Sequence, residues 1–314
     1  EGVSDRISQP VALRWTAHDP GTLFQAVAML WTARNWQDFQ AAMRLWDVPS
    51  QNIVYADVDG NIGYQMPGRI PLRAAGDGRA PVAGWTGEYE WVGWIPYDDL
   101  PSVFNPAAGF VASANNRVVS YDYPYYLSNE WAPPYRATRI NELLAAQSNH
   151  TLQSMRDIQA DVYCIPDRDL AAYILALPPQ TARERAAHDV IAAWDYRTSM
   201  DSVAASIVET TLGYVMRYTF ADELGKRTND YLDNGVPVLL RILPDGGNRW
   251  FDDVTTAVVE TRDDIVQRGF RQALADLEAQ LGADMARWTW GRLHTATFDH
   301  DVFGKVAVLN RIFN

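Results

Sequence analysis

The sequence predicts an α+β fold in which a sheet-containing section is followed by a helical insertion. The first third of the chain carries short runs of alternating apolar and polar residues, the pattern of half-buried strands. After Pro133, apolar residues recur at three- and four-residue spacing, which is the period of a helix. We therefore expect a sheet-containing section over residues 1–145, a mainly helical insertion over 146–285, and an incomplete return to the first section over 286–314.

Strands and a pair of helices account for the first section. Four runs have the pattern of strands: residues 11–15, 53–57, 62–66 and 110–114. The second and third of these flank Asp59-Gly60, a dipeptide typical of a tight hairpin because glycine accepts a positive φ. Residues 22–46 have helical spacing that is interrupted near Asn35, so we expect two short helices there.

The rest of the chain is dominated by helical patterns. They cover residues 135–146, 151–162, 203–220 and 264–281. The last of these is followed by Gly282, at the position where a glycine commonly ends a helix. Residues 288–298 and 306–313 have a strand-like or irregular pattern, which is why we expect the chain to return there to the sheet section.

Composition excludes several classes of protein. The chain has 27 Lys and Arg against 39 Asp and Glu, a net charge of −12, and 47 % hydrophobic residues. A disordered chain is excluded by the apolar content, and a nucleic-acid-binding protein by the lack of a clustered basic face. No run approaches the roughly 18 apolar residues that a membrane span requires. Cys164 is the single cysteine, which excludes an internal disulfide and a cysteine metal site.

Generic motifs assign no chemistry to the chain. There is no nucleophile elbow and no glycine-rich phosphate loop. The histidines show no zinc-ligand spacing, although His294 and His300 lie close enough in sequence to share a site. Surface histidines are the more common explanation of such a pair.

A second pattern places carboxylates among tryptophans. Glu88 and Glu90 lie between Trp85 and Trp91, with Trp94 nearby, which is typical of a glycan-binding or glycosidase groove. Aromatic residues in Gly- and Pro-rich loops are more often packing anchors. Glycan binding therefore remains an alternative to be tested by titration with oligosaccharides.

Longer motifs recur in a fixed order from residue 11 to the C-terminus. The most specific are Leu13–Ala17 (LRWTA), Asn52–Tyr64 (NIVYADVDGNIGY), Gly84–Trp91 (GWTGEYEW), Ala112–Arg117 (ASANNR), Pro133–Arg136 (PPYR) and Trp290–His294 (WGRLH). In order and spacing these motifs resemble the penicillin amidase (penicillin acylase) family of N-terminal-nucleophile hydrolases. The helical middle of the chain matches least specifically.

The resemblance implies a four-layer αββα sandwich with two antiparallel sheets between helices. It also implies a precursor that cuts itself into an α chain and a β chain, and a β chain that begins with a nucleophilic serine. The free α-amine of that serine, with a pKa of about 8, can act as its general base. This chain would then be an internal part of the β chain. Its implied partners are the upstream β-chain segment, the α chain and a small acyl-amide substrate, with no nucleic acid and no membrane span.

Two residues would carry family roles in the reaction. Asn115 matches the asparagine whose side-chain amide donates to the oxyanion, and Arg136 matches the arginine that orients it and the nucleophile's terminus. No cofactor is implied, but a structural calcium ion is a candidate. Asp122 is a weak ligand for it, because residues 125–128 lack the acidic residue that some members use. Most relatives are exported, so the resemblance implies a periplasmic or secreted protein.

The chain begins at Glu1 and ends at Asn314 in mid-pattern, so we expect it to be a piece of a larger protein. The expected activity of the whole protein is the cleavage of an acyl amide, either the side chain of a penicillin or cephalosporin or an acyl-homoserine lactone. Since the nucleophile lies outside the chain, the chain alone is expected to be inactive. The alternative is a non-catalytic fragment that serves as a scaffold or binding module of the same fold.

Overall fold

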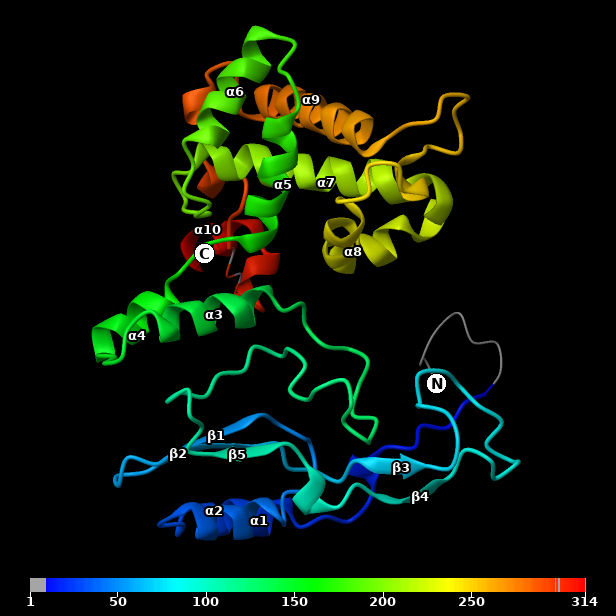
Figure 1. Cartoon of the computed structure of the whole chain (residues 1–314), viewed down its shortest axis with the longest axis vertical. Helices are drawn as coiled ribbons and strands as arrows, with labels where there is room; N and C mark the ends of the chain where they lie inside the picture. Colours follow the sequence, from blue (N-terminus) through cyan, green and yellow to red (C-terminus); the bar gives the residue numbers. More distant parts are fainter. Residues whose placement is uncertain (1–9, 297, 299, 314) are drawn as a thin grey trace. The chain divides into compact units, whose positions relative to one another are not determined.

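The computed structural model describes residues 10–296, 298 and 300–313. The chain divides into two compact units, Glu1–His150 and Thr151–Asn314. The first unit holds all of the strands in the described part, and the second is helical (Figure 1). Each unit is described by itself below.

A three-stranded antiparallel sheet forms the centre of the first unit. It consists of β1 (Ile53–Ala56), β2 (Ile62–Gln65) and β5 (Ser102–Phe104), in the order β1-β2-β5. Gly60, with a φ of 86°, turns the chain between β1 and β2, so the predicted hairpin is confirmed. A second, two-stranded sheet pairs β3 (Pro71–Arg73) with β4 (Trp91–Trp94).

Two short helices cover one face of the three-stranded sheet (Figure 1). They are α1 (Leu23–Leu30) and α2 (Trp36–Met43), as the interrupted spacing predicted. The interruption is a helix cap, because the Asn35 side chain accepts a hydrogen bond of 2.8 Å from Asp38 N at the start of α2. Phe39 and Met43 of α2 are buried in a cluster with Tyr55 of β1.

The indole of Trp36 requires a glycine in the adjacent strand. It stacks on Phe39 and Phe104, with centroids 5.2 and 4.9 Å apart. A Cβ atom at Gly63 would lie 2.5 Å from this indole, so the sheet and α2 approach each other closely only because residue 63 has no side chain.

The strands predicted over residues 11–15 and 110–114 were wrong, since both segments are irregular in the structure. A strand needs a hydrogen-bonding neighbour, and none of the described strands pairs with either segment. These two segments therefore have the alternating pattern of a strand but no described strand beside them with which to form a sheet. After the second segment the chain continues through loops to α3 (Tyr135–Ala145), which confirms the helix predicted there.

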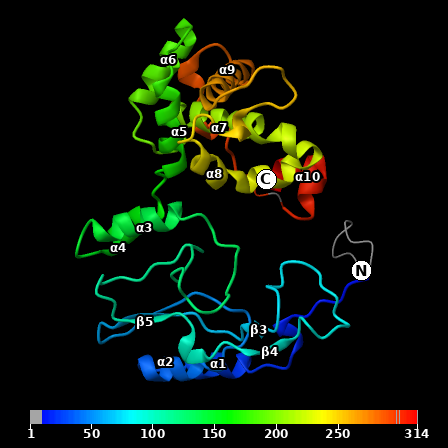
Figure 2. The same cartoon turned by 45° about the vertical axis from the view of Figure 1, so that its right-hand side comes forward.

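The second unit is built around the long helix α7 (Val203–Leu224), which lies beside α9 (Arg262–Leu281) (Figure 2). Its other helices are α4 (Leu152–Gln159), α5 (Ile165–Ala176), α6 (Ala182–Ala192), α8 (Thr228–Ile242) and α10 (Ala307–Phe313). The 3-10 turns of the chain are Thr16–His18, Tyr97–Asp99, Gly225–Arg227, Arg249–Phe251, Met285–Arg287, Trp290–Arg292 and Phe303–Lys305. Buried apolar residues of α5, α7, α8 and α9 form one continuous core.

Capping interactions mark both ends of α9, the helix with the clearest sequence pattern. Thr261 accepts from Asp264 N, and the Asp264 carboxylate accepts from Thr261 N at 2.9 Å, a reciprocal capping box at the start of α9. Gly282, with a φ of 93°, ends the same helix. The helices predicted over 151–162, 203–220 and 264–281 are confirmed as α4, α7 and α9.

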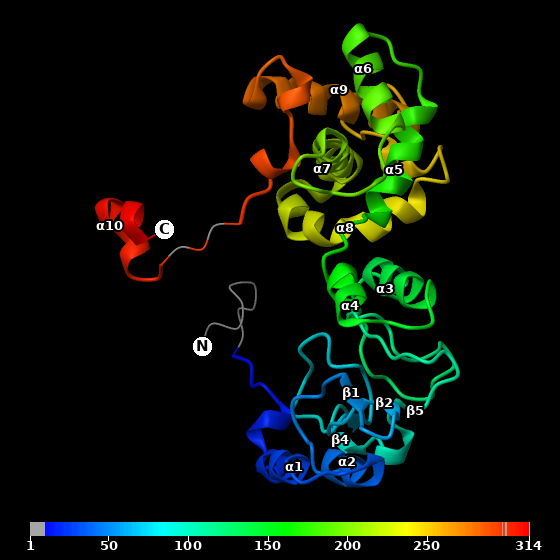
Figure 3. The ribbon, with the colours of Figure 1, turned by 90° about the vertical axis from the view of Figure 1, so that its left-hand side faces the viewer.

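The helical unit contains more helix than predicted (Figure 3). Helices α5, α6 and α8 lie within the predicted helical insertion but were not predicted individually, and residues 306–313, expected as strand-like or irregular, contain α10. Helix α8 has Gly235 and Pro237 in its interior, which lower the propensity for a helix and conceal its pattern. The return of residues 286–314 to the sheet section of the whole protein stays a prediction. In the described part, every helix is too short or too polar to cross a bilayer.

The contact between α7 and α9 is so close that it leaves no room for a side chain at Gly269. A Cβ atom at Gly269 of α9 would lie 2.8 Å from Val215 Cγ2 and 3.2 Å from Val215 N of α7. We expect Gly269→Ala to destabilise the protein by about 1–3 kcal/mol, because overpacking outweighs the gain in helix propensity. Gly213 of α7 is the matched control position, because it is exposed and a Cβ atom there would meet no other described part of the chain within 4 Å.

We expect Gly213→Ala to stabilise the protein by up to about 1 kcal/mol, since it gains helix propensity without a clash. Denaturant unfolding followed by far-ultraviolet circular dichroism compares the two variants. A Gly269→Ala protein as stable as the Gly213→Ala protein would contradict the close α7–α9 packing.

Candidate active site

Arg136 joins the start of α3 to the loop that carries Asn115. Its Nη2 atom donates to the carbonyl oxygen of Ala114 at 2.8 Å and to Asn115 Oδ1 at 3.0 Å. The two predicted site residues therefore lie in direct contact, although they are far apart in sequence. Ala114 is buried, while the side chains of Asn115 and Arg136 are exposed.

The loop holds Asn115 in an uncommon backbone conformation. Its φ is 61°, in the left-handed region that asparagine tolerates better than most residues other than glycine. The carbonyl of Asn115 accepts from Ala132 N at 2.8 Å, and Asn116 Oδ1 accepts from Ala114 N at 3.1 Å. These bonds fix the backbone on both sides of Asn115, so its side chain extends from an ordered turn.

Arginine chemistry determines which way the Asn115 amide faces. A guanidinium has only donors, so it must contact the amide oxygen and not the amide nitrogen. The Nδ2 group of Asn115 is consequently turned away from Arg136. Among the described residues, no acceptor is hydrogen-bonded to that nitrogen. The Asn115 Nδ2 group is therefore available as a hydrogen-bond donor.

Asp122 lies in the same unit, with an exposed carboxylate. A hydrogen bond from Ser120 lowers its pKa, so the carboxylate is ionised at neutral pH. Within the described ranges, three metal-donor side chains come together at one place, Cys164, Asp167 and Glu209, and Asp122 is not part of that group. Calcium binding by Asp122 stays a prediction.

Four aromatic side chains among the other sequence candidates pack on neighbouring groups, whereas Trp85, Glu88 and Glu90 are exposed. His294 stacks on Trp290 with centroids 5.0 Å apart, and His300 stacks on Phe303 at 4.6 Å. Trp91 and Trp94 meet edge to face at 5.6 Å, and the Arg14 guanidinium lies 4.6 Å from the Trp91 centroid. Each of these four rings thus contacts a residue near it or a cation, which is how packing anchors behave.

A hollow of about 320 Å³ in the first unit contains a buried acid that the sequence analysis did not single out. Asp47 is 5 % exposed and accepts from Thr22 N at 2.5 Å and from Arg69 Nη2 at 2.9 Å. Burial alone would raise the pKa of Asp47, but the bonds from Arg69 and Thr22 lower it. Asp47 therefore functions as an anchor for the loop that contains Arg69.

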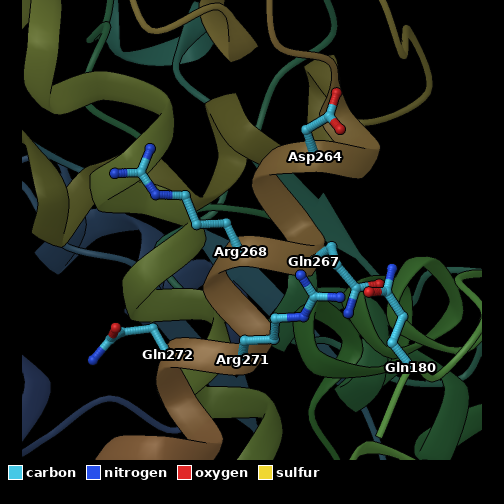
Figure 4. Close-up of a pocket in the computed structure, with 6 residues that line it drawn as sticks. All are labelled: Gln180, Asp264, Gln267, Arg268, Arg271 and Gln272. Carbon is cyan, nitrogen blue, oxygen red and sulfur yellow. The ribbon is translucent and has the colours of Figure 1, made fainter. Parts of the chain in front are cut away.

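A second hollow, of about 400 Å³, lies along α9 in the helical unit (Figure 4). Arg268 and Arg271 leave the helix there in opposite directions. Arg271 Nε donates to Glu184 Oε1 at 3.1 Å, and Arg268 lies 4.1 Å from the ring centroid of Tyr218. Because both cations already have protein partners, this hollow is not a free anion site.

Comparison with known proteins identifies the family of the chain. Residues 3–314 match the family model described as penicillin amidase. The chain belongs to this family. It is 32 % identical over 289 residues to an acyl-homoserine lactone acylase, QuiP, of Pseudomonas fluorescens, a match that covers 84 % of the chain and 35 % of the relative.

Two further relatives bear the penicillin acylase name. The chain is 40 % identical over 166 residues to penicillin acylase 2 proenzyme of Pseudomonas sp. strain SE83, covering 52 % of the chain and 21 % of the relative. A thermostable penicillin G acylase of Alcaligenes faecalis has a similar structure, with a TM-score of 0.66 and 23 % identity over 85 % of this chain and 53 % of that one. This similarity confirms the predicted α+β class, as part of the αββα N-terminal-nucleophile hydrolase fold.

The chain spans about a third of the length of the first curated relatives it matches. The glycan-groove alternative gains no support from relatives that are named as acylases.

Glu184, which lies beside the α9 hollow, should make the stability of the protein depend on pH. It is 2 % exposed and accepts from Gln180 N at 2.7 Å as well as from Arg271. Burial would raise the pKa of Glu184, but these bonds lower it below its ordinary value. The Glu184 carboxylate therefore contributes stability above the ordinary glutamate pKa, and that contribution is lost as the pH falls through the lowered folded-state value.

We expect Glu184→Gln to reduce the free energy of unfolding at neutral pH by about 1.5–3 kcal/mol, the range for hydrogen bonds to charged groups. The difference from the wild type should shrink as the pH falls below the ordinary glutamate range. Urea unfolding at a series of pH values measures it. A difference that is constant with pH would show that the charge of Glu184 is not what stabilises this contact.

Proposed function

We propose that this chain supplies the oxyanion-binding part of an acyl-amide hydrolase of the penicillin acylase type. The observation that carries the proposal is the contact of Arg136 with Asn115 Oδ1, which leaves Asn115 Nδ2 as a donor. The nucleophile would be an N-terminal serine of the β chain that lies outside this chain. Acylase names among the relatives support the reaction class.

In the proposed reaction, the serine hydroxyl attacks the amide carbonyl while the serine's own α-amine takes the proton. The carbonyl oxygen becomes an oxyanion, and Asn115 Nδ2 donates to it together with a backbone N–H from the upstream segment. The amine leaves with the proton, and water then hydrolyses the acyl-enzyme. Asn115 gains most of its effect in the transition state, because the oxygen is then charged and accepts a stronger hydrogen bond.

Arg136 would act as a positioning residue. Its donation to Asn115 Oδ1 fixes the amide orientation, and its donation to Ala114 O fixes the turn from which Asn115 projects. Its positive charge, placed near the serine α-amine in the assembled site, would also favour the neutral, basic form of that amine.

The substrate class and the partners belong to the same proposal. An acyl-homoserine lactone or a penicillin or cephalosporin side chain is the proposed acyl amide. The upstream β-chain segment and the α chain of one precursor would complete the site, no cofactor would be needed for the chemistry, and the protein would be periplasmic or secreted. The intact masses of the purified whole protein test the precursor cleavage: a mature chain that begins with serine is expected, and a single uncleaved chain with full activity would contradict it.

Removal of the Asn115 amide tests the proposed donor directly. We expect Asn115→Gly in the whole protein to reduce kcat by about 10²–10³-fold with a much smaller change in KM, as for other single oxyanion donors. Glycine accepts the φ of 61° without strain, so this variant removes the amide while keeping the turn. Initial rates on a panel of acyl amides measure the effect, and a wild-type kcat for Asn115→Gly would sink the assignment.

The positioning role of Arg136 has its own test. Arg136→Met should reduce kcat by about 10–100-fold, since two charge-assisted hydrogen bonds are lost, and Arg136→Lys should restore part of it. Arg139→Met is the matched control on the same helix, because Arg139 pairs with Glu142. If the Arg136 and Arg139 variants lose the same small amount of activity, Arg136 has no special role in the site.

The alternative is a non-catalytic scaffold or binding module. It predicts that the whole protein, with the upstream segment and α chain present, turns over no acyl amide in the same panel. Turnover that depends on Asn115 would exclude it.

A further inference from the structure

A group of three metal-donor side chains lies in the helical unit, whereas Asn115 and Arg136 belong to the first unit. Cys164 Sγ and carboxylate oxygens of Asp167 and Glu209 all lie within 4.8 Å of one another. Cys164 is the residue immediately before α5, Asp167 is in the first turn of α5, and Glu209 is on α7. The group therefore links the start of α5 to the central helix of the unit.

Asp167 has no satisfactory partner in this arrangement. Its side chain is completely buried, and neither carboxylate oxygen makes a hydrogen bond of ordinary geometry within the described residues; its interactions with the Cys164 thiol and the Glu209 carboxyl supply no positive charge. A buried carboxylate without donors costs several kcal/mol, so such a group needs a cation or a proton. Its immediate neighbours are Cys164 and Glu209, which bring a thiol and a second acid and no positive charge.

The electrostatics of the three side chains agree with this geometry. Burial and the Glu209 carboxylate raise the pKa of Asp167, and burial also raises the pKa of Glu209 and of the Cys164 thiol. His294 opposes the change at Glu209 but is exposed and lies outside the three-residue group. The site disfavours negative charge unless a cation neutralises it.

We propose that Cys164, Asp167 and Glu209 bind a divalent transition-metal ion, of which Zn²⁺ fits the donors best. A thiolate and two carboxylates are established types of zinc ligand, whereas a thiolate is a poor ligand for calcium or magnesium. Three protein ligands leave a fourth position for water. Cys164 and Glu209 are only half-buried, so an ion and its water can reach the group.

The proposed site corrects the prediction that a chain with one cysteine has no cysteine metal site. That prediction holds for sites built from several cysteines, but a mixed site needs one thiolate and oxygen donors from elsewhere in the chain. Glu209 comes from another helix, so no local spacing could indicate the group. The ion would hold α5 against α7 and would take no part in amide hydrolysis.

Binding of the ion is tested on the purified whole protein. The protein is stripped with a chelator, incubated with equimolar Zn²⁺, dialysed and analysed for retained metal. We expect the wild type to retain one more Zn²⁺ per molecule than Cys164→Ser or Asp167→Asn. Glu223→Gln is the matched control, because Glu223 is another acid of α7 whose raised pKa, about 7, comes from burial and Asp222 outside the group. This variant should retain as much zinc as the wild type.

Substitution with Co²⁺ identifies the sulfur ligand. The wild type and Glu223→Gln should show a thiolate-to-cobalt charge-transfer band in the near ultraviolet that Cys164→Ser lacks. If wild type and Cys164→Ser retain the same zinc and give the same cobalt spectrum, the proposal is overturned, and the acids share a proton instead.

A measurement on the wild type alone covers the case in which the variants fail to fold. Alkylation of Cys164 by iodoacetamide is followed by mass spectrometry of its peptide, with and without Zn²⁺. With Zn²⁺ at ten times its dissociation constant, mass action predicts alkylation about tenfold slower. The Zn²⁺ concentration is raised until a competing chelator is saturated. An alkylation rate that stays unchanged over this whole range would also overturn the proposal.

Discussion

The two hydrogen bonds donated by Arg136 Nη2 are the interaction on which the candidate active site depends. They connect a helix start, a buried carbonyl and an exposed amide, at 2.8 and 3.0 Å. Because a guanidinium cannot accept a hydrogen bond, the contact also fixes which end of the Asn115 amide is available to a ligand. A single cation thus determines both the position and the polarity of the proposed oxyanion donor.

Hydrogen bonds hold the backbone of the loop on both sides of Asn115, although the buried Ser113 Oγ just before it has no hydrogen-bond partner among the described residues. Ala132 N and Asn116 Oδ1 hold the backbone on either side, so the left-handed conformation of Asn115 is held in place by its surroundings. The amide nitrogen of Asn115 is left without a partner among the described residues, as the proposed role of an oxyanion donor requires.

Two buried acids of the helical unit, Glu184 and Asp167, have neighbours of opposite electrostatic effect. Glu184 is surrounded by an arginine and amide donors, so its pKa falls and its charge stabilises the contact with α9. Asp167 is equally buried but faces an acid and a thiol, so its pKa rises. A buried acid is thus an anchor in one place and a candidate ligand in another, and the difference is the sign of the neighbouring charge.

The sequence predicted structural features that are determined by residues close together in the chain, and it failed for features that depend on distant residues. The hairpin at Gly60, the break between two helices near Asn35 and the end of α9 at Gly282 were predicted because turn and cap chemistry is complete within a few residues. The strand expected over residues 110–114 was not, since a strand depends on neighbours distant in sequence.

The candidate site was predicted only through the family resemblance. An asparagine after an apolar run and an arginine at a helix start have no distinctive pattern of their own. The group of Cys164, Asp167 and Glu209 was missed because its third member reaches the others through the packing of α7 against α5. Sequence order does not encode that contact in any short motif.

The most direct test of the account is a crystal structure of the whole protein with a tetrahedral acyl-phosphonate adduct on its nucleophile. The account predicts that Asn115 Nδ2 lies about 2.7–3.1 Å from the phosphonate oxygen that replaces the oxyanion, while Oδ1 stays on Arg136. An adduct oxygen bound entirely by other donors, with Asn115 out of hydrogen-bonding range, would contradict it.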